Sequence, residues 1–232
     1  NHTGLLQGVL TVMLKIDISE KTKSNRHADR THYDRELLYK TIDEALICHV
    51  GCQSDGTPVV VPTACWRKDN RIYCHGNKHS RVMRAAAKKE DACITVTHLD
   101  GLVLAAAGFS HSLNYRSAMM FGQLHLLETK KEMLAALDDL VNHIIPGRAK
   151  QVRTANEGEA GATAVFYMEL EEASIKMRNE PPMDSEEDQD RRLWTGEVPI
   201  RYTMEKPIPS PYLVKGVKEP DFKAILKARW ER

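Results

Sequence analysis

Two stretches of the chain repeat apolar residues at the three-and-four spacing of an amphipathic helix. In residues 33–45 the apolar positions are Leu37, Leu38 and Ile42, and the residues between them are mostly polar. In residues 130–145 a longer apolar stripe runs as far as Pro146-Gly147, a pair that ends helices. This period puts the apolar side chains on one face, so we expect two helices that pack on the body of the protein.

Most of the remaining apolar residues occur in short runs rich in β-branched and aromatic residues, separated by turn signals. Asp55-Gly56 predicts one hairpin turn, and the polar stretch 67–70 predicts a second. Residues 99–107 fit a helix or a strand equally well. The predicted strands cover residues 46–50, 57–66, 71–74, 92–98, 118–127, 162–170 and 193–200. We therefore predict a mainly β chain with helices, of the α+β class, built as one antiparallel barrel or sheet.

The two ends of the chain and one internal segment differ from this pattern. Residues 4–14 form an apolar run that we read as a terminal strand or short helix, because it is too short to span a bilayer. Residues 179–192 are acidic and predict a surface excursion. The proline-rich residues 201–232 predict an extended tail that lies over the body and ends in a short helix at 222–230.

Charge and cysteine content exclude some classes of function. Thirty-three basic and 32 acidic residues leave a net charge of +1, which gives no field that would attract nucleic acid or an acidic membrane. Five cysteines, mostly within apolar runs, favour a reducing compartment, and we expect a cytoplasmic protein. Cys48 and Cys52 could supply two ligands of a zinc site. The sequence has no second pair of ligand residues at the spacing that such a site requires, so we predict no metal.

The loop 75–81 concentrates chemistry in seven residues. It contains Gly76, Ser80, two histidines, and the cations Lys78 and Arg81, and it leads directly into the helical residues 82–89. Backbone N–H groups at a helix start, a hydroxyl and a guanidinium together can bind phosphate. The alternative is a solvated basic loop at the end of a hairpin.

A second polar cluster precedes the strand predicted to begin at Ala118. It is formed by His111, Ser112, Asn114, Tyr115, Arg116 and Ser117. Hydrogen-bonding groups at a strand end suit the rim of a ligand site. The alternative is a hydrated turn.

Taken together, a series of short motifs resembles the pyridoxamine 5′-phosphate oxidase-related flavoproteins, in particular their flavin-nucleotide-binding branch near the nitroimidazole-resistance proteins. The motifs include Val61-Pro-Thr, Tyr73-Cys-His-Gly, His79-Ser-Arg, Val96-Thr-His-Leu-Asp-Gly, His111-Ser-Leu-Asn-Tyr-Arg-Ser and Trp194-Thr-Gly-Glu-Val-Pro. The resemblance implies a split β-barrel over residues 26–200, preceded by an extension at 1–25 and followed by a tail at 201–232 packed on the barrel.

The resemblance also implies FMN, held in a groove between the two subunits of a homodimer. We matched the family's flavin-contacting positions to this sequence one by one. Pro62 and Thr63 match the strand whose backbone passes the flavin ring, and His75 and Gly76 match the strand end that borders the ring and the ribityl chain. Ser80 and Arg81 match the pair of residues that binds the phosphate, and Lys78 is a further candidate for a phosphate contact. The last group of flavin contacts matches Asn114, Tyr115, Arg116 and Ser117.

Two questions remain open at this stage. The segment that holds the substrate in the oxidases has no counterpart in the tail Pro211-Tyr-Leu-Val, so no substrate residues follow from the resemblance. His75 matches a histidine close to the flavin, which suggests a catalytic proton donor; the alternative is a strand-end histidine that is hydrogen-bonded to backbone. The leading hypothesis is an FMN-dependent oxidoreductase that takes electrons from a nicotinamide donor and passes them to a small organic molecule. The alternatives are a non-catalytic protein that stores or senses flavin or another planar ligand, and a structural scaffold.

Overall fold

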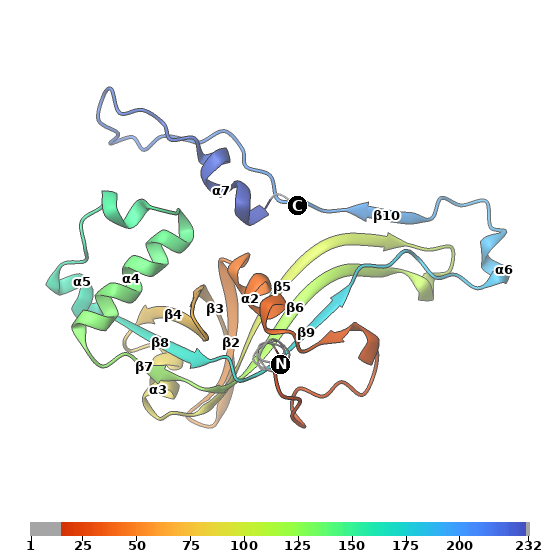
Figure 1. Ribbon diagram of the computed structural model, residues 1–232, viewed down its shortest axis with the longest axis horizontal. Coiled ribbons are helices and arrows are strands. Elements are labelled where there is room, and N and C mark those ends of the chain that lie inside the picture. Colours follow the sequence, from red (N-terminus) through yellow and green to blue (C-terminus); the bar gives the residue numbers. More distant parts are fainter. Residues whose placement is uncertain (1–14, 231–232) are drawn as a thin grey trace, which may run out of the picture.

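The computed structural model describes residues 15–230, which form one curled antiparallel sheet with helices on its faces (Figure 1). The strands are β1 (Thr31–His32), β2 (Ile47–Ser54), β3 (Thr57–Lys68), β4 (Arg71–Asn77), β5 (Asp91–Leu104), β6 (Ser112–Gln123), β7 (His125–Leu126), β8 (Thr163–Glu169), β9 (Glu172–Arg178) and β10 (Gly196–Pro199). Their order across the sheet is β1-β9-β6-β5-β2-β3-β4-β8-β7, with β10 paired to β5. The predicted α+β split barrel is confirmed.

The helices are short, and several begin at side-chain caps. They are α2 (Arg35–Asp43), α3 (Arg81–Ala87), α4 (Lys130–Ile144), α5 (Glu157–Ala162), α6 (Glu186–Gln189) and α7 (Phe222–Trp230), with 3-10 turns η1 (Ala28–Arg30), η2 (Gly108–Ser110) and η3 (Arg148–Gln151). Asp34 accepts a hydrogen bond from the Leu37 amide at the start of α2, and Thr129 forms a reciprocal capping box with Glu132 at the start of α4. These caps satisfy amides that have no partner within the helix.

The two predicted hairpin turns are present. Asp55 and Gly56 both adopt positive φ, 52° and 77°, in the turn between β2 and β3. Asp69 has φ 52° in the turn between β3 and β4. Aspartate and glycine tolerate this left-handed region better than other residues, which is why these pairs mark the hairpins in the sequence.

One face of the sheet curls around the main core. Buried side chains from β2, β4, β5 and β6, such as Cys48, Ile72, Ile94 and Met120, meet there with Leu38 of α2. Residues from α3 join the same cluster. Because side chains alternate along a strand, every second residue of these strands is committed to this interior.

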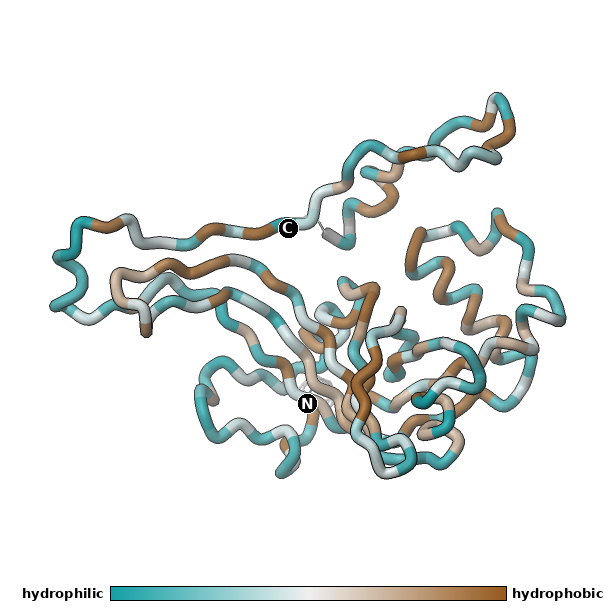
Figure 2. The backbone as a smooth tube through the Cα atoms, turned by 180° about the vertical axis from the view of Figure 1, so that it is seen from behind, coloured by the Kyte–Doolittle hydropathy of each residue, from teal (hydrophilic) through white to brown (hydrophobic). Residues whose placement is uncertain are grey.

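The opposite, outer face is only partly covered. Helix α4 packs over β3, β4 and β8 and buries Trp66 and Tyr73 against Ala136 and Leu140. Beyond α4 the outer face is open, and its exposed apolar residues are Ile47, Val60, Leu99, Leu102, Leu113 and Met119. Figure 2 shows the resulting apolar stretches (brown) along the central strands.

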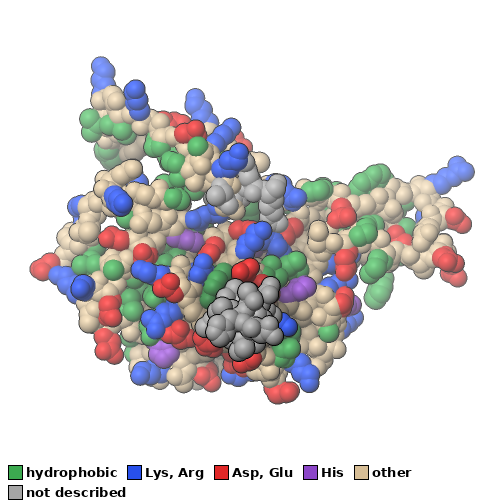
Figure 3. All heavy atoms as spheres, viewed as in Figure 1, with side chains coloured by type: hydrophobic (Ala, Val, Ile, Leu, Met, Phe, Trp, Pro, Cys, Tyr) green, Lys and Arg blue, Asp and Glu red, His purple; other side chains and the backbone are tan. Residues whose placement is uncertain are grey.

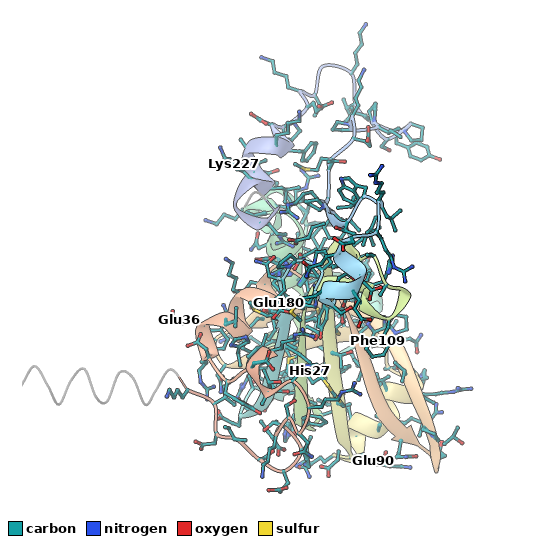
Figure 4. The ribbon with its side chains drawn as sticks, turned by 90° about the vertical axis from the view of Figure 1, so that its right-hand side faces the viewer. His27, Glu36, Glu90, Phe109, Glu180 and Lys227 are labelled. Atoms are coloured by element: carbon teal, nitrogen blue, oxygen red, sulfur yellow. The ribbon has the colours of Figure 1, made fainter. Side chains whose placement is uncertain are left out.

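The long hairpin of β5 and β6 extends from the body as an arm, with β10 running along one edge (Figure 1). Phe109, in the turn between the two strands, is 99% exposed and stands out from this region (Figure 4). The carboxylate of Asp184 accepts hydrogen bonds from the amides of Ala106 and Ala107 at 2.8 and 3.1 Å. These bonds hold the acidic segment, predicted as a surface excursion, against the arm.

The tail after β10 is extended, as predicted, and its last described element is α7. Leu226 of α7 is buried, and Arg229 donates a hydrogen bond to the carbonyl of His143 near the end of α4. Between β10 and α7 the tail exposes hydrophobic side chains such as Ile208 and Tyr212, and Figure 3 shows it as a projection from the body. The three-part division of the chain at residues 25 and 200 stays a prediction.

Several predicted boundaries need correction. Strand β6 begins at Ser112 and not at Ala118, so the polar cluster lies within the strand and not in a turn before it. The ambiguous stretch 99–107 is strand as far as Leu104. The short strand β1 is not among the predicted strands, and the apolar run 4–14 lies outside the described residues. Among residues 15–230, none of the helices combines the length and apolar character that a membrane span requires.

Candidate functional site

The end of β4 and the start of α3 form a compact polar loop. Ser80 caps α3 by accepting a hydrogen bond from the Met83 amide at 3.3 Å. The side chain of Asn77 accepts from the amide of His79 at 2.9 Å, and the carbonyl of Asn77 accepts from the amide of Ser80 at the same distance. These hydrogen bonds within the loop fix the conformation of its backbone, and with it the positions from which Lys78, His79 and Arg81 extend.

The cations of this loop point to solvent. Lys78, His79 and Arg81 are all exposed, and within residues 15–230 none of the three forms an ion pair with a carboxylate. By contrast, Arg84 and Lys88, further along the same helix and just beyond it, both pair with Asp55. A positive group that no carboxylate neutralises favours binding of an anion.

His75 lies next to this loop on the outer face of β4. Its ring is 6.3 Å from that of Trp66, at an interplanar angle of 60°. The Nδ1 atom is buried and has no hydrogen-bond partner among residues 15–230. Burial lowers the pKa of His75 below its ordinary value, so the neutral imidazole is the favoured form. The alternative reading of His75 is a strand-end histidine hydrogen-bonded to backbone, and the Nδ1 atom makes no such bond within the described residues.

The residues matched to the flavin ring lie beside His75. The hydroxyl of Thr63 donates to the carbonyl of His75 at 3.1 Å, which ties β3 to β4 beyond their last paired residues, Cys65 and Cys74. Pro62 precedes Thr63 on the open part of the outer face. A Cβ added to Gly76 would approach the Cε of Met83 to 3.4 Å, so the protein itself leaves little free space on that side. Pro62, Thr63, His75, Gly76, Lys78, Ser80 and Arg81 are thus brought together in one chain.

The second group of predicted contacts lies elsewhere on the sheet. Strands β2 and β5 separate β6 from β3, which puts the two groups about 14 Å apart at the usual strand spacing. Ser117 shares the outer face with Pro62, because Ser117 pairs with the exposed Thr97 and Met119 with Thr95. Within one chain, the β6 residues do not reach the loop.

The side chains of Asn114 and Arg116 are engaged in polar networks. Arg116 bonds to both oxygens of Asp100 at 2.9 and 3.2 Å and to Glu44 at 2.8 Å. Asn114 accepts from the buried Arg178 at 2.5 Å and donates to Glu197 at the same distance. These partners join β6 to α2, β5, β9 and β10, so the two side chains have structural roles that the sequence alone did not indicate.

The cysteines lie apart from this site. Cys48, Cys52, Cys65 and Cys74 are buried, and the sulfur atoms of Cys48 and Cys74 are 3.5 Å apart. A hydrogen bond with the Cys48 thiol, together with burial, raises the pKa of Cys65, which keeps it protonated and unreactive. Within residues 15–230, no three His, Cys, Asp or Glu side chains are arranged to hold a metal ion.

The geometry defines a class of protein: an antiparallel split barrel with an exposed basic loop beside an open outer face. A family model described as pyridoxamine 5′-phosphate oxidase matches residues 34–177. The chain belongs to the pyridoxamine 5′-phosphate oxidase family.

Solved structures agree with this assignment. A flavocytochrome from Azotobacter vinelandii is 36% identical, with a TM-score of 0.83, and the match covers 90% of this chain and 96% of that one. An FAD- and haem-binding protein from Mycobacterium smegmatis is 29% identical, with a TM-score of 0.79 and coverage of 84% and 97%. A 5-nitroimidazole antibiotic resistance protein from Bacteroides thetaiotaomicron, at 22% identity, TM-score 0.53 and coverage of 63% and 85%, shares the fold. A search of curated proteins gives no match.

Proposed function

We propose that the protein is a flavin-dependent redox protein that works as a homodimer. The flavin phosphate binds at Ser80 and Arg81 with help from Lys78, and the ring lies on the outer face beside Pro62, Thr63 and His75. The observation that carries this proposal is the set of exposed loop cations, which have no carboxylate partner among residues 15–230 and lie next to an open apolar face. Both parts of a flavin nucleotide, the anionic phosphate and the planar ring, find a matching surface there.

The flavin is FMN or FAD, and the two share the ring, ribityl chain and first phosphate. The sequence motifs favour FMN. The M. smegmatis relative, at 29% identity, is instead an FAD-binding protein. The site described above accounts for the half that the two molecules have in common, so the mass of the ligand released on denaturation distinguishes them.

The dimer follows from the uncovered outer face. Val60 of β3 is 69% exposed, Ile47 of β2 60% and Met119 of β6 44%, and all three lie on the same face of the sheet. A second copy that packs on this face removes these side chains from water, which is favourable by roughly 25 cal/mol for each Å² of apolar surface. Two-fold symmetry then brings the outward-facing residues of β6 in the second copy, Tyr115 and Ser117, toward the loop, where they contact the flavin as the resemblance implies.

A specific observation favours a haem group as a second cofactor. Burial lowers the pKa of His75 and favours the neutral imidazole, which is the form that ligates haem iron. The two relatives with the highest identities quoted above are a flavocytochrome and an FAD- and haem-binding protein, and their coverage extends well past the 34–177 region. When bound, flavin and haem supply electron transfer, and the protein holds and orients them.

The proposed activity is reduction of a small oxidised organic molecule with electrons from a nicotinamide donor. His75 borders the ring, and it serves either as an iron ligand or as a proton donor there. The buried, unpaired thiols suit a reducing compartment such as the cytoplasm.

Absorption spectra of the purified protein test the proposal. We expect a flavin spectrum that bleaches on anaerobic addition of NADH or NADPH, and a Soret band if haem is present. Denaturation followed by mass measurement identifies each ligand. A flavin that binds but stays oxidised with every donor favours storage or sensing, and a protein that stays colourless after addition of FMN, FAD and haem refutes the proposal.

A further inference from the structure

Four aromatic rings cross the outer face of the sheet in a single row. They come from four neighbouring strands: Trp66 on β3, Tyr73 on β4, Tyr167 on β8 and His125 on β7. Trp66 and Tyr73 are stacked with centroids 5.7 Å apart, Tyr73 and Tyr167 are also 5.7 Å apart, and Tyr167 and His125 stack at 5.2 Å. We call these four residues the aromatic row.

One end of the aromatic row is buried and adjoins the candidate cofactor site. Trp66 is 1% exposed and Tyr73 is 9% exposed, both beneath α4. The ring of His75 lies 6.3 Å from that of Trp66. The buried Nε1 of Trp66 has no hydrogen-bond partner among residues 15–230. A hydrogen bond of the indole therefore does not explain why a tryptophan occupies this position.

The other end reaches the surface. Tyr167 and His125 are partly exposed at the β7 edge of the sheet. The guanidinium of Arg71 lies 4.2 Å from the centre of the Tyr167 ring and is itself paired with Glu169 at 2.7 Å. The aromatic row therefore connects a buried position beside His75 with a position where a small molecule in solution can approach.

We propose that the aromatic row carries single electrons from the surface at Tyr167 to the cofactor beside His75. The proposal rests on the flavin binding proposed above. Indole and phenol side chains can be oxidised by one electron, and the probability of transfer falls steeply with distance, so rings in near contact make an efficient route. Because Trp and Tyr are hard to oxidise, the route operates only when the cofactor is a strong oxidant. The group that is finally oxidised is then a reductant at the surface of the protein.

The electrons and protons balance as follows when light excites the bound flavin. Trp66 loses one electron to the excited flavin, and Tyr167 replaces it through Tyr73, releasing its hydroxyl proton to solvent. A small reductant at the surface, such as a thiolate, then gives one electron and solvent returns the proton. The net change is oxidation of the thiolate by one electron and reduction of the cofactor by one electron.

Cross-strand aromatic pairs also stabilise sheets, so the test must separate packing from electron transfer. Trp66→Phe keeps an apolar ring that is not readily oxidised, whereas Trp66→Tyr keeps a ring that is. Tyr167→Phe removes the surface donor. Tyr212→Phe, in the tail and 91% exposed, is the matched control. Flavin content and thermal melting of each variant are measured first.

Time-resolved fluorescence and transient absorption of the flavin-loaded proteins then provide the readout. In the wild type we expect short-lived flavin fluorescence and a tyrosyl signal that follows an oxidised tryptophan. Trp66→Phe should lengthen the fluorescence lifetime several-fold and abolish both radical signals, and Trp66→Tyr should restore quenching in part. Tyr167→Phe should prolong the tryptophan signal, and Tyr212→Phe should match the wild type.

Two outcomes contradict the proposal and are distinguishable. If flavin binds with full occupancy but Trp66→Phe quenches and reacts as the wild type does, the aromatic row is a packing feature and the inference is wrong while the proposed function stands. If no variant and not even the wild type binds flavin, the proposed function fails and the electron route fails with it.

Discussion

The hydroxyl of Thr63 donates a hydrogen bond to the carbonyl oxygen of His75 at 3.1 Å. The two residues are twelve positions apart in the chain, and the motif resemblance assigns both to the border of the same ring. The bond closes the gap between β3 and β4 where regular pairing has ended at Cys65 and Cys74. It therefore helps to hold the ends of β3 and β4 together next to Pro62 and His75, the residues proposed to border the ring.

Thr63→Val tests this link, because valine keeps the shape of threonine and lacks the hydroxyl. We expect the free energy of unfolding to fall by about 1 kcal/mol, since the His75 carbonyl loses its bond. Flavin affinity should change little, because the contact assigned to this strand is made by its backbone. Chemical denaturation and flavin titration measure the two effects separately. A large loss of affinity without loss of stability would show that the hydroxyl itself contacts the ligand.

The sequence predicts the hairpins and the basic loop because their signals are local. Asp55-Gly56 and Asp69 mark turns through their own backbone preferences, and the loop cations stand within seven residues of each other. These features depend on neighbours in the chain and not on distant partners.

The polar cluster at the start of β6 could not be predicted in the same way. Asn114 meets Arg178 and Glu197, which are 64 and 83 positions away, and a polar run without visible partners looks like a turn. The alternation along β3 shows which residues point outward, but not which of them α4 covers. Trp66 is covered by α4, whereas Val60 on the same face is exposed. Only the packing of α4 decides this.

Arg116 provides a second prediction. Its guanidinium bonds to Asp100 and Glu44, and all three side chains are less than a fifth exposed. Arg116→Met removes the cation from two carboxylates in a partly buried setting, which should cost about 3–5 kcal/mol of stability. Arg116→Lys keeps the charge but not the fork, and we expect an intermediate loss. Thermal and urea unfolding check this, and an unchanged midpoint in Arg116→Met would contradict the structural role.

The third prediction concerns acid. Burial lowers the pKa of His75 and of His143 below the ordinary value of 6.5 in the folded chain, and for His143 the hydrogen bond to the Ala45 carbonyl opposes this only in part. Below pH 6.5 the unfolded chain therefore binds more protons than the folded chain, so stability present above that pH is lost as the pH falls toward the folded values.

Urea unfolding between pH 7.5 and pH 5, about 1 unit above and about 1.5 units below a histidine's ordinary value, measures this dependence. Glutamine does not titrate, so His75→Gln and His143→Gln should each flatten the slope, and the double variant should flatten it further. A slope that stays the same in the double variant would assign the acid sensitivity to other groups.

The fourth prediction concerns the dimer. Light scattering of the wild type should give roughly twice the 26.3 kDa of one chain. Val60→Asp and Met119→Asp each place a charge on the outer face, and burying an unpaired charge is costly, so we expect monomers that bind flavin poorly. Ile208→Asp is the control, because Ile208 is 93% exposed on the tail and belongs to none of the strands of this face. A wild type that is monomeric with flavin bound would refute the proposed arrangement.

The fifth prediction concerns Arg81, whose exposed guanidinium stands in the first turn of α3 beside Ser80. A guanidinium binds phosphate through two parallel N–H···O bonds, whereas alanine leaves the phosphate with the loop backbone, Ser80 and Lys78. Hydrogen bonds to charged groups contribute roughly 1.5–3 kcal/mol each, so Arg81→Ala should weaken FMN binding by about tenfold to a few hundredfold.

Riboflavin and Lys88→Ala provide the controls for this prediction. Riboflavin lacks the phosphate, so it should bind the wild type weakly and lose little affinity in Arg81→Ala. Lys88 lies just beyond the same helix and already pairs with Asp55, so Lys88→Ala should leave FMN affinity nearly unchanged. Fluorescence titration of both ligands into the wild type and Arg81→Ala gives four dissociation constants and one coupling energy. A coupling near zero would mean that Arg81 does not contact the phosphate and that the loop 75–81 is a solvated hairpin end.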